Sequence, residues 1–143
     1  MTNLRKHFPL LICVALFLVL GQFVARPRPV LAQEQNVQVI ELTAKKYEYS
    51  PSPIHIKSGT KVQLRISAVD HDHGFRISVV PDGAELSGKA GLIFSAPQDC
   101  VLLKKGEVTT IEFLAQMPGT YSFRCCHTCG LGHRGMKNQI VVD

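Results

Sequence analysis

Tryptophan is missing from this 143-residue sequence, and after Gln33 the chain also lacks long helical periods of apolar residues and concentrated basic runs. The lack of a helical period argues against a helical bundle. A nucleic-acid partner would need a concentrated basic face. The formal net charge of +5 does not indicate one, because four of the sixteen basic residues (Arg5, Lys6, Arg26 and Arg28) lie near the N-terminus. From Gln33 onward the chain has twelve basic and eleven acidic residues, so its charge is nearly balanced and we expect no nucleic-acid partner.

Residues 1–32 have the pattern of an export segment. Two basic residues precede an uncharged apolar run at residues 8–25, and two arginines follow it. A run of about 18 residues lies between the length of a signal-peptide core and the ~20 residues of a membrane span. Val-Leu-Ala at residues 30–32 could serve as a cleavage site. The sequence therefore predicts a signal peptide or a single membrane-anchor helix, followed by an exported domain at residues 33–143. We expect this domain in the periplasm or on the outer face of the cytoplasmic membrane.

The exported part is divided into short strands. Apolar and polar residues alternate, as they do along strands with one buried face, at residues 40–44, 54–56, 62–66, 75–79, 108–113 and 121–125, and a closing strand is predicted at 138–142. Prolines at positions 51 and 53 exclude a central strand between 47 and 53. Short strands at this spacing predict an all-β, antiparallel sandwich. A domain of about 110 residues can bury a workable core without disulfides.

A cluster of sulfur and imidazole ligands follows the strand at residues 121–125. Its members are Cys125, Cys129, His133 and Met136. Thiolate and imidazole ligands suit copper, zinc or iron, and a thioether favours copper. Three glycines in the same segment disfavour a helix, because each lowers helix stability by roughly 1 kcal/mol. The segment is therefore predicted to be a loop that doubles back and brings the four groups to one metal site.

Other kinds of site use similar residues. Cys126 and Cys129 form a C-x-x-C pair, which could be a redox pair or half of a zinc site. A structural zinc site needs a second pair of cysteines or histidines, and none follows. Attachment of c-type haem needs a histidine where Gly130 stands. A structural disulfide is the strongest alternative in an exported protein, but it does not explain the spacing of His133 and Met136.

A further imidazole could come from residues 70–75, Asp-His-Asp-His-Gly-Phe. His71 and His73 are two positions apart, so in a strand both point to the same side. Either can act as a ligand on this reasoning, and the other would be a surface histidine beside an aspartate.

The spacing Cys125-x-x-x-Cys129-x-x-x-His133-x-x-Met136, with its Cys-Gly-Leu-Gly-His core, resembles the dinuclear copper (CuA) loop of cytochrome c oxidase subunit II. It is most similar to the short subunit II of certain bacterial haem–copper oxidases. A one-copper blue site needs only one cysteine on such a loop, so the second cysteine makes the signal specific. The resemblance covers about residues 37–142 and implies a cupredoxin fold, a Greek-key β-sandwich.

The family carries an Asp-x-x-His-Gly-Phe-like stretch, which Asp70 and His73 match with the two residues that follow. The resemblance therefore favours His73 over His71. It implies two copper ions bridged by the two cysteines, with one histidine completing each and weak axial ligands from a methionine and a backbone carbonyl. The implied metal ligands are His73, Cys125, His127 (through its carbonyl), Cys129, His133 and Met136.

When the protein fills every ligand position, no open position remains for a substrate. The resemblance thus implies electron transfer, with no catalysis by this chain alone. The expected route runs from a donor such as cytochrome c, through the copper pair, to haem in the catalytic subunit of an oxidase. The alternative is an exported copper carrier, assembly factor or sensor, and a thiol-redox module at Cys126 and Cys129 is a third interpretation.

The chain departs from the family pattern in three places. Cys126 stands next to a proposed ligand, and residues 81–100, which end at Cys100, look like an insertion that could form a hairpin or a flap near the metal. Many members use an aromatic residue near the first histidine to receive electrons. Without a tryptophan, Phe75 is the nearest candidate.

Overall fold

The computed structural model describes residues 37–85 and 89–143. In chain order the elements are β1 (Val37–Lys45), β2 (Glu48–Ser50), β3 (Ile54–Ile56), β4 (Thr60–Ala68), β5 (His73–Ile77), β6 (Leu92–Phe94), β7 (Val101–Leu103), β8 (Val108–Ala115), β9 (Gly119–Arg124), the 3₁₀ helix η1 (His133–Gly135) and β10 (Lys137–Val142). The predicted leader at residues 1–32, with its possible anchor at 8–25, lies outside the described residues. Within them, no helix combines the length and the apolar character that crossing a membrane requires.

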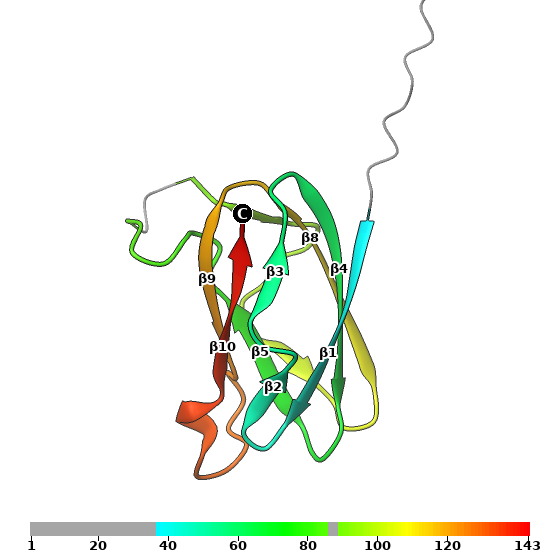
Figure 1. Cartoon of the computed structure of the whole chain (residues 1–143). Helices are drawn as coiled ribbons and strands as arrows, with labels where there is room; N and C mark the ends of the chain where they lie inside the picture. Colours follow the sequence, from blue (N-terminus) through cyan, green and yellow to red (C-terminus); the bar gives the residue numbers. More distant parts are fainter. Residues whose placement is uncertain (1–36, 86–88) are drawn as a thin grey trace, which may run out of the picture. The chain divides into compact units, whose positions relative to one another are not determined.

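The strands form two sheets of five, in the orders β2-β1-β4-β8-β6 and β3-β10-β9-β5-β7. Figure 1 shows the two layers, with β10, β9 and β5 on one side and β1, β4 and β8 on the other. Most neighbouring strands run antiparallel, as predicted. Two pairs, β1 with β4 and β3 with β10, are parallel. These strands are joined through crossovers between the sheets rather than hairpins, and only crossovers allow parallel pairing.

The long strands are held in the sandwich by apolar side chains at every second position. In β4, Val62, Leu64 and Ile66 are buried, while their neighbours in the strand are exposed or half-buried. Residues of both sheets join one apolar core between the layers. The alternation predicted for residues 75–79 is wrong at its end. The strand stops at Ile77, and Val79 is 40% exposed while Val80 is buried.

The proline-rich stretch lies at the sheet edges. β2 is an edge strand of the first sheet and β3 is an edge strand of the second, as expected next to prolines, which have no backbone N–H to donate and are therefore confined to sheet edges. The break in pattern after residue 47 nevertheless hides β2, whose middle residue, Tyr49, is only 2% exposed. β2 has a single core residue between two polar ones, which is too little to show a repeated alternation.

Residues 81–100, for which the sequence suggested a hairpin or a flap near the metal, form no hairpin within their described part. Leu92–Phe94 forms β6 and pairs with β8 at the edge of the first sheet. The segment then ends at Cys100, which forms a disulfide with Cys126. It therefore joins the edge of one sheet to the loop that carries the proposed metal ligands.

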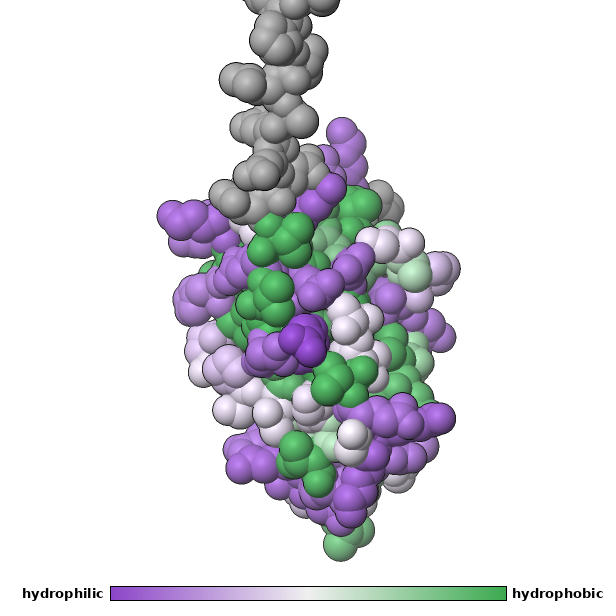
Figure 2. Space-filling view, turned by 90° about the vertical axis from the view of Figure 1, so that its right-hand side faces the viewer, coloured by the Kyte–Doolittle hydropathy of each residue, from purple (hydrophilic) through white to green (hydrophobic). Residues whose placement is uncertain are grey.

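Figure 2 looks at the side of the domain that carries β1 and β4, where hydrophilic and hydrophobic residues are interspersed. The apolar residues include Val37 and Val39, which are 55% and 52% exposed. An ion pair follows them along the strands. Arg65 on β4 lies opposite Glu41 on β1, with 2.8 Å between Nη1 and Oε1. An exposed pair of this kind contributes little to stability.

Candidate metal centre

The predicted metal loop is closed at its base like a hairpin. β9 and β10 pair antiparallel up to Arg124 and Lys137, which lie opposite each other. One step further, the backbone N–H of Cys125 donates to the carbonyl of Met136 at 2.9 Å. Residues 125 and 136 thus lie side by side although eleven positions separate them. The single turn of η1 just before β10 gives the doubled-back loop that the glycines predicted.

Both cysteines of the predicted site are free, buried and close together. Their Sγ atoms are 3.7 Å apart. Cys129 Sγ also lies 3.7 Å from Nδ1 of His133 and 3.9 Å from Sδ of Met136. The Cys125 thiol donates to the carbonyl of His127 at 3.1 Å. Five of the six residues predicted as ligands therefore meet around the two thiols, although their role as ligands stays a prediction.

The sixth residue, His73, opens β5 and is fully buried. Its Nε2 donates to Oδ1 of Asp70 at 2.8 Å. Because an ionised carboxylate only accepts hydrogen bonds, the proton sits on Nε2 and the lone pair is on Nδ1. That Nδ1 is buried without a hydrogen-bond partner. A carboxylate behind one nitrogen and a free lone pair on the other is the arrangement of a metal-binding histidine.

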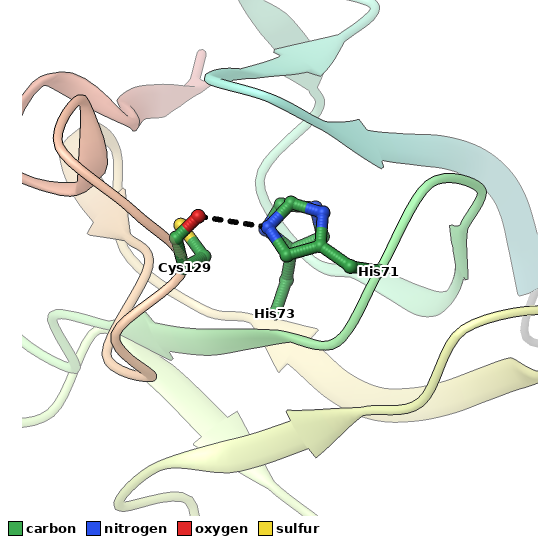
Figure 3. Close-up of side chains that lie close together, drawn as sticks. All are labelled: His71, His73 and Cys129. Atoms are coloured by element: carbon green, nitrogen blue, oxygen red, sulfur yellow. Dashed lines mark hydrogen bonds between the residues drawn. The ribbon is translucent and has the colours of Figure 1, made fainter.

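His71 lies beside His73, with 4.2 Å between the ring centroids, as Figure 3 shows. Its Nε2 donates to the carbonyl of Cys129 at 2.9 Å. Its Nδ1 lies 2.9 Å from Oδ1 of Asp70, without the geometry of a hydrogen bond. Both histidines and Cys129 offer ligand atoms within 4.8 Å of one another. The two imidazoles lie side by side, but β5 begins at His73 and His71 lies in the bend before it, where it already holds the loop backbone.

Asp70 is kept ionised by the groups around it. Burial opposes its ionisation, but hydrogen bonds from His73 and from the backbone N–H groups of Lys46 and His71 outweigh that effect and hold the pKa of the carboxyl well below its usual range. The thiol of Cys129 behaves in the opposite way. Burial, together with the neighbouring Cys125, raises the pKa of the Cys129 thiol to about 11. The protein without metal therefore keeps this thiol protonated at neutral pH.

Gly74 lets the metal loop rest directly on β5. A Cβ at this position would lie 2.5 Å from the backbone nitrogen of His127 and 2.7 Å from Sγ of Cys126. The backbone N–H and the carbonyl of Gly74 also both form hydrogen bonds. Its N–H donates to Sγ of Cys125 at 3.3 Å, and its carbonyl accepts a hydrogen bond from the hydroxyl of Tyr49. This close approach explains why a glycine follows His73.

Phe75, the aromatic residue predicted to receive electrons, is 1% exposed and lies in the core beside Phe123. A partner protein cannot reach it. The aromatic residue at the surface of the loop is Tyr47, which is 38% exposed. A Cβ at Gly132 would lie 2.2 Å from its ring, so the ring packs flush against the loop backbone. Sequence reasoning missed Tyr47 because it precedes the proline-rich stretch and belongs to no strand pattern.

The disulfide between Cys100 and Cys126 corrects two interpretations of the cysteines. Cys126 is bonded to Cys100 and not paired with Cys129, so no C-x-x-C redox pair forms. The sequence pattern assigns no role to Cys100, whereas the structure bonds it to Cys126. Because its sulfur is bonded to Cys100, Cys126 has no thiol to offer to a metal.

Comparison with known proteins identifies the fold family. A family described as the cupredoxin-like domain matches residues 10–142. The chain belongs to this family. The predicted cupredoxin sandwich is therefore confirmed, and the buried thiols and imidazoles lie at one end of it.

Cupredoxins with several functions are similar to this chain. It is 29% identical over 107 residues to proteins named cytochrome c oxidase subunit 2 from Thermus thermophilus, a match that covers 75% of this chain and 67% of one relative but 54% of another. Among solved structures, the periplasmic domain of subunit II of cytochrome oxidase (CoxB) from Bradyrhizobium japonicum is 14% identical with a TM-score of 0.55, over 74% of this chain and 83% of that one. Auracyanin A, a "blue" copper protein from Chloroflexus aurantiacus, is 16% identical with a TM-score of 0.56, over 76% of this chain and all of that one. These two structures share the fold.

Proposed function

We propose that this cupredoxin is an exported electron-transfer protein that binds copper at the end of the sandwich where the loop of residues 125–136 meets β5. The observation that carries the proposal is the pair of free, buried thiols 3.7 Å apart. Sulfur and imidazole together suit copper, and the thioether of Met136 strengthens that preference. The similarity to proteins named cytochrome c oxidase subunit 2 points the same way.

The finer part of the proposal is that the site holds two copper ions of the CuA type. Two thiolates this close can bridge two metals, whereas a one-copper site needs only one. His73 and His133 would complete one copper each, through the nitrogens that face the thiols or have no other partner. The full set of proposed ligands is His73, Cys125, His127 (carbonyl), Cys129, His133 and Met136. A bound copper pair would supply reversible one-electron oxidation and reduction.

The residues of the chain prepare this chemistry in three ways. Asp70 fixes the tautomer and orientation of His73. Burial of both thiols and of Met136 excludes water from the site. The hydrogen bond between Cys125 N–H and Met136 carbonyl holds the two ends of the loop together, so little needs to rearrange when the charge of the site changes. Thiolates bind metal, so both thiols must lose their protons on loading.

Export and the partners are part of the same proposal. Disulfides persist in oxidising compartments, which supports a periplasmic or outer-face location for the bond between Cys100 and Cys126. Residues 8–25 are predicted to be either a membrane anchor or part of a cleaved signal peptide. The boundary between residues 1–32 and the domain at 33–143 also stays a prediction. We propose a donor such as cytochrome c and, as acceptor, the catalytic subunit of a haem–copper oxidase. Tyr47, exposed against the loop, is the proposed contact for the donor.

The test is the copper-to-protein ratio together with electron paramagnetic resonance of the oxidised protein. We expect two coppers per chain and hyperfine splitting from one electron shared by two nuclei. Cys125→Ser and Cys129→Ser should each leave a one-copper site with a different colour. One copper per chain in the unaltered protein, with splitting from a single nucleus, contradicts the dinuclear centre. A protein that binds no copper contradicts the whole proposal.

A copper carrier, assembly factor or sensor is the second candidate, and one observation favours it. The side chain of His71, which is 29% exposed, shares a ligand cluster with the buried His73 and Cys129. A carrier would use it to pass metal on once its Nε2 is released from the Cys129 carbonyl. Competition with a strong Cu(I) chelator separates the two functions. An electron-transfer centre should retain its copper and its colour for hours, whereas a carrier should release copper within the mixing time.

A further inference from the structure

Three basic side chains form a row across the second sheet, next to the metal loop. Arg124 on β9 lies opposite Arg76 on β5 and opposite Lys137 on β10. β10, β9 and β5 are adjacent strands in Figure 1, so the three cations are at one level. Like charges directly opposite one another destabilise a sheet. The row therefore costs stability, and the fold alone gives no reason for it.

Acidic residues relieve this repulsion at one end only. The guanidinium of Arg76 pairs with the carboxylate of Asp99 and donates from Nε to its backbone carbonyl at 2.7 Å. Arg124 and Lys137 are exposed. In the described part of the chain, neither has a carboxylate within ion-pair distance. Two unpaired cations thus face solvent on either side of the loop's base.

The row borders a groove with a volume of about 290 Å³. Ile77 and Phe123 lie along it with the three cations, and so does Ser122. Ser122 donates to Asp82 from its hydroxyl at 2.6 Å and from its backbone N–H, so the acidic group near the groove is already satisfied. The groove offers room for a carboxylate side chain of another protein beside Arg124, whose guanidinium can bind a carboxylate in a bidentate way, with Lys137 next to it.

The position of the row ties it to the proposed metal site. Arg124 directly precedes Cys125, and Lys137 directly follows Met136. A residue of a strand spans about 3.4 Å, so a partner seated on these cations is within one residue of two proposed ligands. The two segments are also joined by the hydrogen bond from Cys125 N–H to the Met136 carbonyl.

We propose that the row of Arg76, Arg124 and Lys137 is a docking surface for an acidic redox protein. This inference rests on the proposed function and adds to it the class of partner: one whose carboxylates surround its exposed redox group. The charge is local, because the exported part of the chain is nearly neutral as a whole. A local patch steers association, raising the on-rate at low salt and losing its effect at high salt.

The experiment measures how fast two small c-type cytochromes, one of negative and one of positive net charge, reduce the copper-loaded full chain in a stopped-flow instrument. With the acidic cytochrome, we expect the rate constant to fall on the order of tenfold between about 10 mM and about 200 mM salt. R124E/K137E should remove this dependence. The matched control K57E/K61E makes the same change in net charge at the opposite end of the sandwich and should keep it.

Several outcomes overturn the proposal. The rate with the acidic cytochrome could be independent of salt, or K57E/K61E could lose the dependence equally. Binding to vesicles of anionic phospholipid that needs Arg124 and Lys137, with cytochrome rates unaffected by R124E/K137E, would assign the row to a membrane surface instead. Failure of the proposed function is separate and is seen first: no copper spectrum forms, or ascorbate fails to reduce the loaded protein. If ascorbate reduces it and the charge of the cytochrome makes no difference, only the docking surface is wrong.

Discussion

Replacing both members of the disulfide, as C100S/C126S, should weaken the copper-free domain strongly without disturbing its metal site. The bond links residues 26 positions apart. In the chain-entropy description, closing a loop of this length restricts the unfolded chain by about 3.5 kcal/mol at 25 °C. Cys100 is exposed and Cys126 is half-buried, so serine hydroxyls at both positions can reach water. The loss in the free energy of unfolding should therefore be about 3 kcal/mol, which is much of the stability of a typical domain.

Urea denaturation of the copper-free chain measures this loss. Circular dichroism is the suitable signal, because the chain has no tryptophan. The unaltered protein with a reducing agent present should match C100S/C126S, which controls for the substitutions themselves. After copper loading, the copper-to-protein ratio and the visible spectrum should be those of the unaltered protein.

Two results would refute this reasoning. A loss below about 1 kcal/mol would mean that the bond does not constrain the unfolded chain as its loop length requires. A changed copper spectrum would mean that the bond positions the ligands, acting through Cys126 on its neighbour Cys125. The double variant is preferred to Cys126→Ser alone, which would leave a reactive thiol at Cys100 near the metal loop.

Three further predictions follow from the site. His73→Ala should lower the copper-to-protein ratio and change the visible spectrum, while His71→Ala should leave both intact, since His73 is fully buried with Asp70 behind its Nε2, whereas His71 is hydrogen-bonded to the Cys129 carbonyl; the opposite result would assign the ligand role to His71. Gly74→Ala should destabilise the copper-free domain in urea by about 1–3 kcal/mol, because its Cβ would lie 2.5 Å from the nitrogen of His127, and an unchanged midpoint would show that the loop is not seated on β5. The thiol of Cys129 has a pKa of about 11 in the fold against an ordinary value of 9.0, so the folded state binds the proton more tightly. Its contribution to the stability of the copper-free protein is complete below about pH 9 and is lost as the pH rises to about 11; denaturation curves that do not change over this range contradict it.

The sequence predicted those features that depend on nearby residues. Alternation identifies β4, β8 and β9 because each has one face in the core. The ligand spacing predicts a metal loop because all but one of the proposed ligands lie within twelve residues that one hairpin closes. Among the strands of three residues, alternation reveals β3, which has an apolar residue at each end, whereas β2 has a single core residue and β6 and β7 are apolar throughout, so no alternation marks them.

Features that depend on distant partners were not predictable. The sequence predicted His71 and His73 on one face, but the choice between them depends on their partners, the carboxylate of Asp70 for His73 and the carbonyl of Cys129 for His71. Cysteine spacing does not determine connectivity, so the bond from Cys126 to Cys100 could not be derived. The parallel pairs follow from the order of strands in the sandwich, which no single segment encodes.

Gly74 shows how a weak sequence signal can mark the point on which a site depends. In the sequence it is one glycine in a strand, a residue that usually weakens a strand. In the fold, its N–H contacts the sulfur of Cys125, its carbonyl accepts from Tyr49, and its missing side chain admits the backbone of the metal loop. Three segments far apart in the chain meet at this residue. Any other side chain would push the loop away from β5 and separate the buried imidazole of His73 from the two thiols, so the glycine is needed for the two halves of the site to come together.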